Sequence, residues 1–159
     1  MVNNTLQMIG MTLLPFLELR ASIPYGILFL KENWAYVFMI CTITNILLGI
    51  ILYPLIGKII FIMTRIKFID KIYQYYIVKT QKKVRKYVNR YGEFGIALFI
   101  GIPLPGSGVY SGSLGGYLIG LGYKKFIIAN VLGVLVAGII VTIVVLTGSN
   151  ALEFFIKTI

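Results

Sequence analysis

Apolar residues form two long uninterrupted runs, and other apolar segments of the chain are broken by polar residues, prolines and glycines. The uninterrupted runs lie within residues 34–57 and 124–148, and about 20 apolar residues suffice for a helix that crosses the ~30 Å hydrocarbon core of a bilayer. Trp34 at one end of the first run and Lys58 just after its other end are residue types that anchor helices at membrane interfaces. We predict that both runs are membrane spans.

The segment before the first span, residues 5–30, is apolar but broken in its middle. Pro15, the charged pair Glu18 and Arg20, and Pro24 interrupt it, and a proline kinks or ends a helix. Each arm, of about ten to twelve residues, would be roughly 15 to 18 Å long, which is about half of the hydrocarbon core. We therefore predict a re-entrant hairpin with an unwound turn between the two prolines, in which Glu18 and Arg20 could pair.

The segment before the second span, residues 93–122, is broken in a similar way. Its middle contains a cluster of prolines and small residues, namely Pro103, Pro105, Gly106, Ser107 and Gly108. Non-helical backbone is tolerated at membrane depth only where protein or a water-filled cavity shields it, and such breaks mark the binding sites of many transporters. We predict a second re-entrant hairpin, and with it a role in transport.

The stretch between the two halves, residues 58–91, is strongly basic. Ten of the 15 basic residues of the chain lie there, against a single acid, Asp70. Apolar residues recur at intervals of three and four between the charges, as in an amphipathic helix. The positive-inside rule places this basic connector in the cytoplasm, with anionic membrane lipid as its natural partner. A solvated linker helix that packs on the protein's own loops is the alternative.

The order of these segments predicts an all-α integral membrane protein built from two inverted repeats. One membrane domain, residues 1–159, would hold a first repeat at 5–57 and a second at 93–148, each a re-entrant hairpin followed by a transmembrane helix. The basic amphipathic connector would join them. With two hairpins Lys124 and Lys125 return to the cytoplasmic side, whereas four ordinary spans would leave them outside. An inverted repeat of this kind is the signature of many transporter folds.

Two asparagines agree with such an internal similarity. Pro15 precedes Asn45 by 30 residues and Pro103 precedes Asn130 by 27, and both asparagines lie early in an apolar span. Polar residues inside a membrane are costly and often functional. We therefore count both asparagines as candidate intramembrane polar residues.

Composition narrows the class of function. With 58% apolar residues and a mean hydropathy of +0.91, the chain is too apolar to be soluble, so its net charge of +10 does not indicate nucleic-acid binding. It has one cysteine and no histidine, which removes an internal disulfide and the commonest metal ligand. We expect no metal and no cofactor. We also expect no enzymatic activity, since no aspartate pair, Ser-His pair or metal can be assembled.

Glu18 and Arg20 are the charges that fall well inside apolar surroundings. Burying such charges costs several kcal/mol unless they face a cavity or find partners. They are candidate substrate- or ion-binding residues. The alternative is a structural ion pair that fixes the hairpin turn.

The turn of the second hairpin is a candidate anion site. Residues 101–108 have the composition of a loop whose backbone N–H groups are free to face a ligand, and the helix after them would add its positive N-terminal dipole. Three nearby hydroxyls, those of Ser107, Tyr110 and Ser111, can extend a polar site. Glycines at positions 108, 112, 116 and 120 also form a ladder typical of close helix packing. Ligand approach and packing are both open interpretations of these glycines.

Two stretches of the chain resemble a known family. LPFLELRASIPYGI (residues 14–27) and IPLPGSGVYSGSLGGYLIGL (residues 102–121) closely resemble the two signature stretches of the small multi-drug export protein family, in order and in spacing. That family is similar to the DedA membrane proteins, whose fold pairs two oppositely oriented re-entrant hairpins with full spans. The family name implies drug export. The DedA relatives imply movement of polyprenyl phosphate and other lipids, and proton coupling.

The resemblance carries over to four positions. Glu18 and Arg20 match the acidic and basic positions of the first hairpin, and Pro105 and Gly106 match the proline–glycine turn of the second. DedA proteins place an arginine soon after that turn, where residues 107–110 of this chain read SGVY. Arg20 would therefore have to supply the positive charge alone.

Together these observations predict a homo-oligomeric transporter of the cytoplasmic membrane, with membrane lipids and an amphiphilic substrate as partners. The leading function is movement of an anionic amphiphile, such as a phospholipid or a polyprenyl phosphate, with proton coupling through Glu18. Export of small hydrophobic cationic compounds is an alternative, in which Glu18 would be the counter-ion of the substrate. A non-transporting membrane scaffold, whose basic connector recruits lipids or partners, is another.

Overall fold

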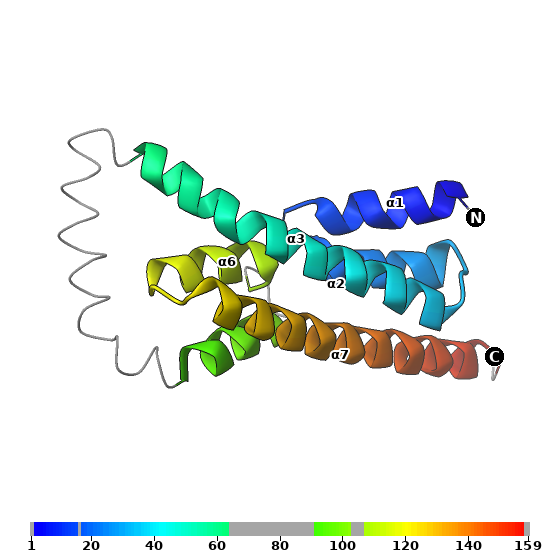
Figure 1. Ribbon diagram of the computed structural model, residues 1–159. Coiled ribbons are helices and arrows are strands. Elements are labelled where there is room, and N and C mark those ends of the chain that lie inside the picture. Colours follow the sequence, from blue (N-terminus) through cyan, green and yellow to red (C-terminus); the bar gives the residue numbers. More distant parts are fainter. Residues whose placement is uncertain (1, 16, 64–90, 103–106, 158–159) are drawn as a thin grey trace.

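The part of the chain that the structure describes is built from helices. The computed structural model describes residues 2–15, 17–63, 91–102 and 107–157, and its elements are helices joined by turns (Figure 1). The predicted all-α class is therefore confirmed for these residues. The basic connector predicted over residues 58–91 lies, from residue 64 to residue 90, outside them.

A helical hairpin begins the chain. α1 (Val2–Leu13) leads to a turn at Pro15, and α2 (Glu18–Pro24) returns beside it and continues into the short π-helix η1 (Tyr25–Phe29). The two arms have similar lengths of roughly 18 Å, so neither is long enough to cross a bilayer alone.

The second arm of this hairpin is bent but not unwound at Pro24, which corrects the loose turn that the sequence predicts. Glu18 and Arg20 lie in the first turn of α2. The chain widens into a π-helix directly after Pro24, where the N–H of Leu30 bonds the carbonyl of Tyr25 at 3.1 Å. Such widening is a common adjustment inside helices, and here it follows a residue that removes one helical hydrogen bond.

Two long helices form the centre of the bundle. α3 (Trp34–Met63) and α7 (Tyr123–Lys157) pack against each other and run in opposite directions (Figure 1). Their apolar stretches, Trp34–Ile62 and Tyr123–Gly148, are long and apolar enough to cross a membrane. The sequence predicts both.

Both long helices extend beyond the predicted limits of the spans. α3 continues past Lys58 to Met63, and α7 continues past residue 148 to Lys157. A helix does not have to end where the apolar run ends, because a lysine can direct its charged end to the interface while the backbone remains helical. The span boundaries predicted from the apolar runs are therefore too short as helix boundaries.

A second pair of short helices follows the basic connector. The helix Tyr91–Gly101, drawn in green in Figure 1, precedes the turn, and α6 (Val109–Leu118) follows it. The first of these helices lies so close to α7 that a Cβ atom at Gly133 would be 2.7 Å from the carbonyl oxygen of Ala97. Glycine at this position therefore permits the contact between the two backbones.

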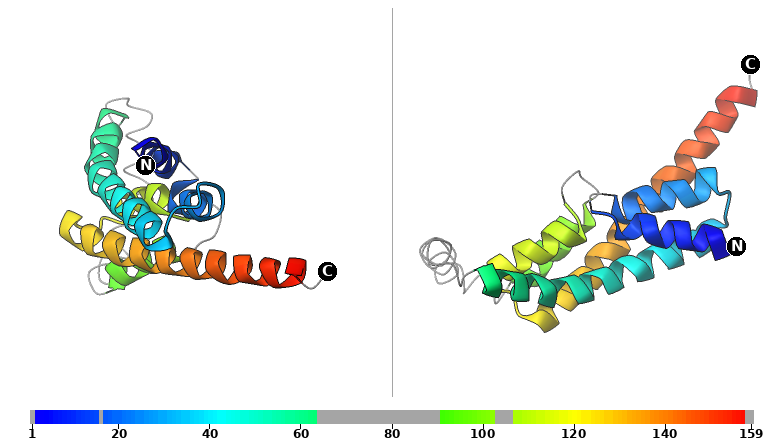
Figure 2. Two further views of the ribbon diagram at one scale, coloured as in Figure 1. Left: turned by 90° about the vertical axis from the view of Figure 1, so that its right-hand side faces the viewer. Right: turned by 90° about the horizontal axis from the view of Figure 1, so that it is seen from above.

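The two hairpins enter the bundle from opposite ends. α1 and α2 extend from the end where the chain begins and the other pair extends from the far end, and the starts of α2 and α6 lie near the middle of the molecule (Figures 1 and 2). The C-terminal end of α7 lies at the same end of the molecule as the start of α1. The inverted repeat and the entry of the hairpins from opposite faces of a membrane stay predictions.

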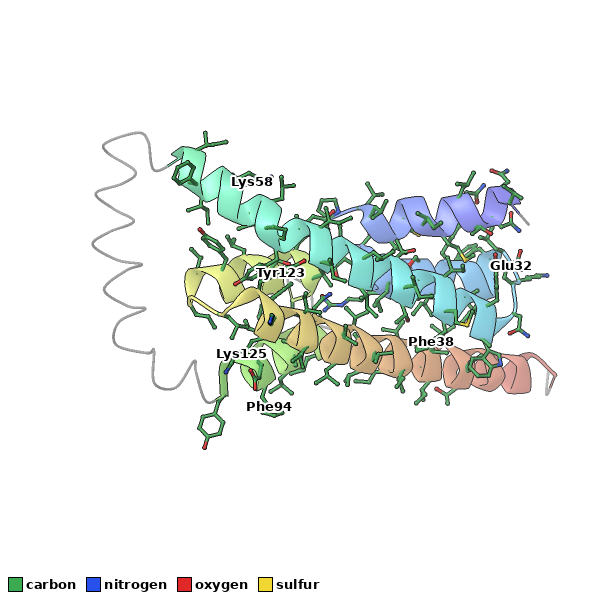
Figure 3. The ribbon with its side chains drawn as sticks, in the orientation of Figure 1. Glu32, Phe38, Lys58, Phe94, Tyr123 and Lys125 are labelled. Atoms are coloured by element: carbon green, nitrogen blue, oxygen red, sulfur yellow. The ribbon has the colours of Figure 1, made fainter. Side chains whose placement is uncertain are left out.

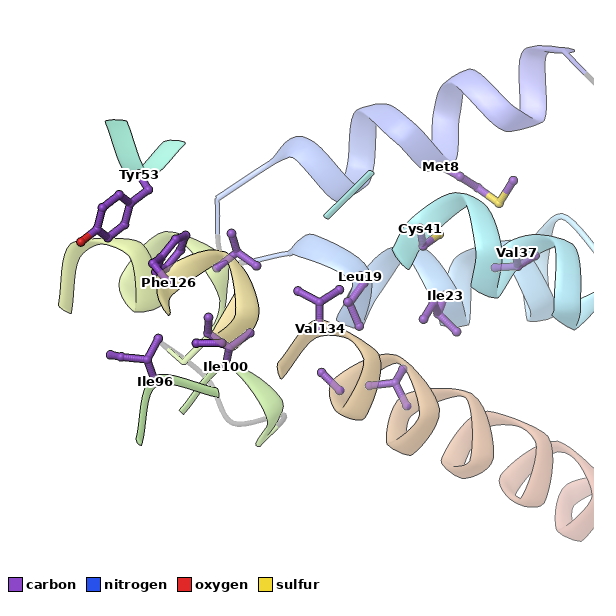
Figure 4. Packing of buried hydrophobic residues seen from close by; sticks show 14 of the residues in the cluster. Met8, Leu19, Ile23, Val37, Cys41, Tyr53, Ile96, Ile100, Phe126 and Val134 are labelled. Carbon is purple, nitrogen blue, oxygen red and sulfur yellow. The ribbon is translucent and has the colours of Figure 1, made fainter. Parts of the chain in front are cut away.

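The buried core connects both hairpins to the long helices. Leu19 and Ile23 of α2 lie among core residues of α3, and Ile100 lies near Phe126 and Val134 of α7 (Figure 4). A separate aromatic contact fixes α3 to the start of α7, with ring centroids of Tyr53 and Phe126 4.2 Å apart. The hydroxyl of Tyr53 also donates to the carbonyl of Leu121.

Apart from Glu18 and Arg20, the charged side chains that the structure describes lie toward the two ends of the bundle. Glu32 is at one end, where it accepts a hydrogen bond of 2.9 Å from Asn4 (Figure 3). Lys58 and Lys125 are toward the other end, and Lys125 Nζ lies 3.2 Å from Glu93 Oε2. Outward-facing apolar side chains cover the length between these ends, as expected for a protein surrounded by lipid.

Candidate functional site

The turns of the two hairpins meet around Glu18, the first residue of α2. Its backbone has φ 48°, a left-handed conformation that is uncommon outside glycine. Gly108, just before α6, has φ 141°, in a region essentially restricted to glycine. Unfavourable backbone conformations of this kind cluster at binding and active sites. Here they come from segments that lie 90 positions apart in the chain.

The carboxylate of Glu18 caps the N-terminus of α6. Glu18 is only 4% exposed, and it accepts hydrogen bonds from the backbone N–H of Val109 at 3.0 Å and of Tyr110 at 3.3 Å. Asn45 Nδ2 approaches the same carboxylate at 3.4 Å. The residue that precedes α6 makes no side-chain cap, so Glu18 supplies an acceptor that the first turn needs. The helix dipole, equivalent to about half a positive charge, adds to the attraction.

Gly108 makes room for this carboxylate. A Cβ atom at Gly108 would lie 2.6 Å from Glu18 Oε2 and 2.8 Å from Oε1. Carbon and oxygen atoms that are not bonded cannot come so close, so any side chain at this position would displace Glu18. The sequence leaves two interpretations of the glycine ladder open, close helix packing and close approach of a ligand. At Gly108 the group that lies close to the backbone is the Glu18 carboxylate of the protein itself.

Arg20 caps the other helix of the second hairpin. Its Nη2 donates to the carbonyls of Ile100 at 3.3 Å and Ile102 at 3.2 Å, and to Ser107 Oγ at 3.0 Å. Ser107 Oγ in turn donates to the carbonyl of Ile102 at 2.6 Å. Carbonyls at a helix C-terminus lack helical partners and are stabilised by a nearby positive charge. Of the two charges of α2, Glu18 therefore caps the N-terminus of α6, and Arg20 caps the C-terminus of the helix Tyr91–Gly101.

The hairpins satisfy each other's backbone in both directions. Tyr110 of α6 donates its hydroxyl to the carbonyl of Leu13, the last residue of α1, at 2.6 Å. Helix ends on both sides of the junction are thus bonded by groups from the opposite hairpin. In a medium without water, each unsatisfied backbone group would cost several kcal/mol. The junction is consequently a set of mutual helix caps built from charged and polar side chains.

The structure brings together several of the predicted site residues but not all of them. Glu18, Arg20, Ser107, Gly108 and Tyr110 meet at the junction, with Asn45 beside them. Ser111 is half-buried in the first turn of α6. Three further predicted residues, Pro103, Pro105 and Gly106, lie outside the described residues.

Asn130 lies at the crossing of the long helices rather than at the Glu18 carboxylate. It is fully buried, and its Nδ2 donates to the carbonyl of Ile46 on α3 at 3.0 Å. A Cβ atom at Gly49 would lie 2.5 Å from the Asn130 side chain. Asn130 therefore joins α7 to α3 at a point where the helices are close. Among the described residues, no three acidic, cysteine or histidine side chains gather as they would around a metal.

The sequence predicts free N–H groups in the loop before α6, and residues 103–106 of that loop lie outside the described residues. The N–H groups of Val109 and Tyr110, which follow the loop, are bonded to Glu18. This contact depends on the docking of two distant segments, so no local pattern reports it. One indication was available: Gly108 has no side chain with which to cap α6, so the cap has to come from another part of the chain. The contacts of Arg20 with main-chain carbonyls likewise join distant segments, so no local sequence pattern predicts them.

Long apolar helices, short helical hairpins and buried charges at their junction define a small helical membrane protein. The chain belongs to the small multi-drug export protein family: the family model described as "Putative small multi-drug export protein" matches residues 18–140. The match begins at Glu18 and includes the second hairpin. No curated protein and no solved structure matches the chain in the same comparisons. The two apolar helices and the family together identify a membrane protein.

Proposed function

We propose that this protein is a transporter that moves an anionic amphiphile, such as a phospholipid or a polyprenyl phosphate, across the cytoplasmic membrane. The observation that carries the proposal is the binding of the Glu18 carboxylate by the N–H groups of Val109 and Tyr110. A position that binds one oxyanion has the donor chemistry to bind another, such as a phosphate. Arg20 adds a cation that keeps its charge under physiological conditions.

A substrate anion can use these donors only after Glu18 has left them. Protonation removes the charge of Glu18 and weakens its bonds to the N–H groups of α6, because hydrogen bonds to a charged acceptor are about twice as strong as neutral ones. Arg20 then becomes the uncompensated charge of the junction. We infer that a proton on Glu18 accompanies entry of the anion, and that loss of the proton restores the carboxylate and expels the anion.

The membrane arrangement that fits this function has two re-entrant hairpins that enter from opposite faces. Arms of roughly 15 to 18 Å would place the junction near the middle of the bilayer, where transporters with inverted repeats bind their substrates. The basic connector would be cytoplasmic, together with Lys124 and Lys125, and would bind anionic lipid. We propose a homo-oligomer whose activity is transport rather than catalysis.

Export of small hydrophobic cations is the second candidate, because the family description favours it. Glu18 would then act as the counter-ion of the substrate. The junction favours the anion for a chemical reason. A proton can neutralise Glu18, whereas Arg20 keeps its positive charge. The net charge of the two side chains therefore changes between zero and positive and does not become negative.

Reconstitution in liposomes tests both candidates in parallel. Movement of a fluorescent anionic lipid and uptake of a cationic dye would be measured with and without a pH gradient, for the wild type and for substitutions at the junction. We expect Arg20→Gln to lose anion movement by about tenfold or more, and Arg20→Lys to retain part of it, because lysine lacks the bidentate geometry. Lys124→Gln, which removes a positive charge far from the junction, is the matched control.

The same assays identify the outcome that contradicts the proposal. Dye uptake that is lost in Glu18→Gln, combined with anion movement that is unchanged in Arg20→Gln, would establish cation export instead. Activity in neither assay would favour the scaffold function. We expect Glu18→Gln to abolish the pH-dependent part of anion movement, since its side chain is neutral at every pH.

A further inference from the structure

A buried amide next to Glu18 has an acceptor that no group in the described part of the chain uses. Asn45 is 1% exposed, and its Nδ2 lies 3.4 Å from Glu18 Oε2. Its Oδ1 is buried and has no hydrogen-bond partner among the described residues. Buried polar atoms are nearly always paired, and an unpaired one costs free energy, so this oxygen needs an explanation.

The other hydrogen bonds that the structure gives the Glu18 carboxylate come from donors. The N–H groups of Val109 and Tyr110 point to its carboxylate. Arg20, on the same helix, has no acceptor atom, and the Tyr110 hydroxyl is directed to Leu13. α7 also packs on α2, but the charged side chains described on it lie in its first turn. A protonated Glu18 would therefore present an O–H group to surroundings that contain donors.

We propose that Asn45 accepts the hydrogen bond of protonated Glu18, so that its amide reverses orientation when the carboxylate takes up a proton. This inference rests on the proposed function in one respect, namely that Glu18 is the group that takes up the proton. The proton enters from water with the anion and returns to water after the anion leaves. Asn45 is thus a positioning residue that recognises both forms of Glu18.

The amide is suited to this task because its two ends differ only in hydrogen-bonding character. Rotation by half a turn about the last side-chain bond exchanges oxygen and nitrogen, and that torsion has a broad, roughly two-fold preference. One end of the amide is paired and the other unpaired in each orientation. The 3.4 Å contact with the carboxylate is long and therefore weak, whereas a protonated carboxyl group would donate a full O–H hydrogen bond to the amide oxygen, so Asn45 stabilises the protonated form more.

Infrared difference spectra of the reconstituted wild-type protein between high and low pH test the inference directly. We expect a carbonyl band of a protonated carboxyl group to appear at low pH, together with a shift of a side-chain amide carbonyl band. Both signals should be absent from Glu18→Gln. A wild-type carboxyl band without any amide shift would overturn the inference. Absence of a band that depends on Glu18 would overturn it too, while the proposed function would still be judged on anion movement.

A pair of substitutions on α3 separates the role of Asn45 from general packing. Asn45→Val removes the acceptor, and Thr42→Val is the matched control, because Thr42 is also buried with an unpaired oxygen one turn away. We expect Asn45→Val to change the frequency of the carboxyl band. We also expect it to lower the pH at which anion movement is half-maximal by about one unit, a tenfold change in proton concentration. Thr42→Val should change neither, and equal effects in both variants would overturn the inference.

Discussion

Gly108→Ala provides the sharpest test of the junction. The added Cβ would lie 2.6 Å from Glu18 Oε2, on a backbone with φ 141°. The conformation alone costs about 1 to 3 kcal/mol for a residue other than glycine. Displacement of the carboxylate would also remove its two hydrogen bonds from α6, each worth about 1.5 to 3 kcal/mol for a charged acceptor. We expect a loss of stability on the order of 4 to 9 kcal/mol.

The measurement is the thermal stability of the purified protein in detergent, with Gly115→Ala as the control on the same helix. A Cβ at Gly115 would meet its nearest neighbour, Ile96, at an ordinary 3.9 Å, so this change should be neutral or stabilising by about 0.5 to 1 kcal/mol. If Gly108→Ala were as stable as Gly115→Ala, the cap by Glu18 would be refuted. In a double-mutant cycle, Glu18→Ala should relieve part of the cost of Gly108→Ala, because the atoms that clash are gone.

Three further predictions concern packing and topology. Gly133→Ala should destabilise the protein by about 1 to 3 kcal/mol, because its Cβ would lie 2.7 Å from a backbone oxygen of the neighbouring helix; Gly10→Ala, with open space around it, is the control in the same melting experiment. Gly116→Leu should lower the melting temperature without changing the oligomeric state in size-exclusion chromatography, since its neighbours within the chain are aromatic rings; dissociation would instead place it at a subunit interface. Lys124→Cys, in a Cys41→Ala background, should react with an impermeant thiol reagent only after the cells are opened, and labelling of intact cells would favour four ordinary spans.

The elements were predictable because their causes are local. Apolar runs of sufficient length predict α3 and α7, and clusters of proline and glycine predict the turns at Pro15 and before α6. The outcome at Pro24 is not predictable in this way, because it does not follow from the local preference of proline. Its local preference is to end a helix, but the hydrogen-bonding pattern widened into η1 and the chain stayed helical. Packing in the rest of the molecule determined which of these outcomes occurred.

The sequence predicts which charged residues lie at the junction, but it does not predict their hydrogen-bond partners. A buried Glu18 and Arg20 stand out in any apolar segment, and the sequence therefore identifies them as candidates. Which atoms they bond is decided by the docking of one hairpin on the other. Only the structure reveals that Glu18 takes the N–H groups of Val109 and Tyr110, while Arg20 takes carbonyls from the preceding helix.

The mutual capping of the hairpins has a consequence for the biogenesis of the protein. Glu18 and Arg20 leave the ribosome more than 80 residues before the helix ends that they bond. During synthesis the first hairpin therefore carries two charges for which the membrane offers no partner, so it has to wait at the aqueous boundary or within the insertion machinery. Docking of the first hairpin onto α6 can therefore occur only after α6 has emerged.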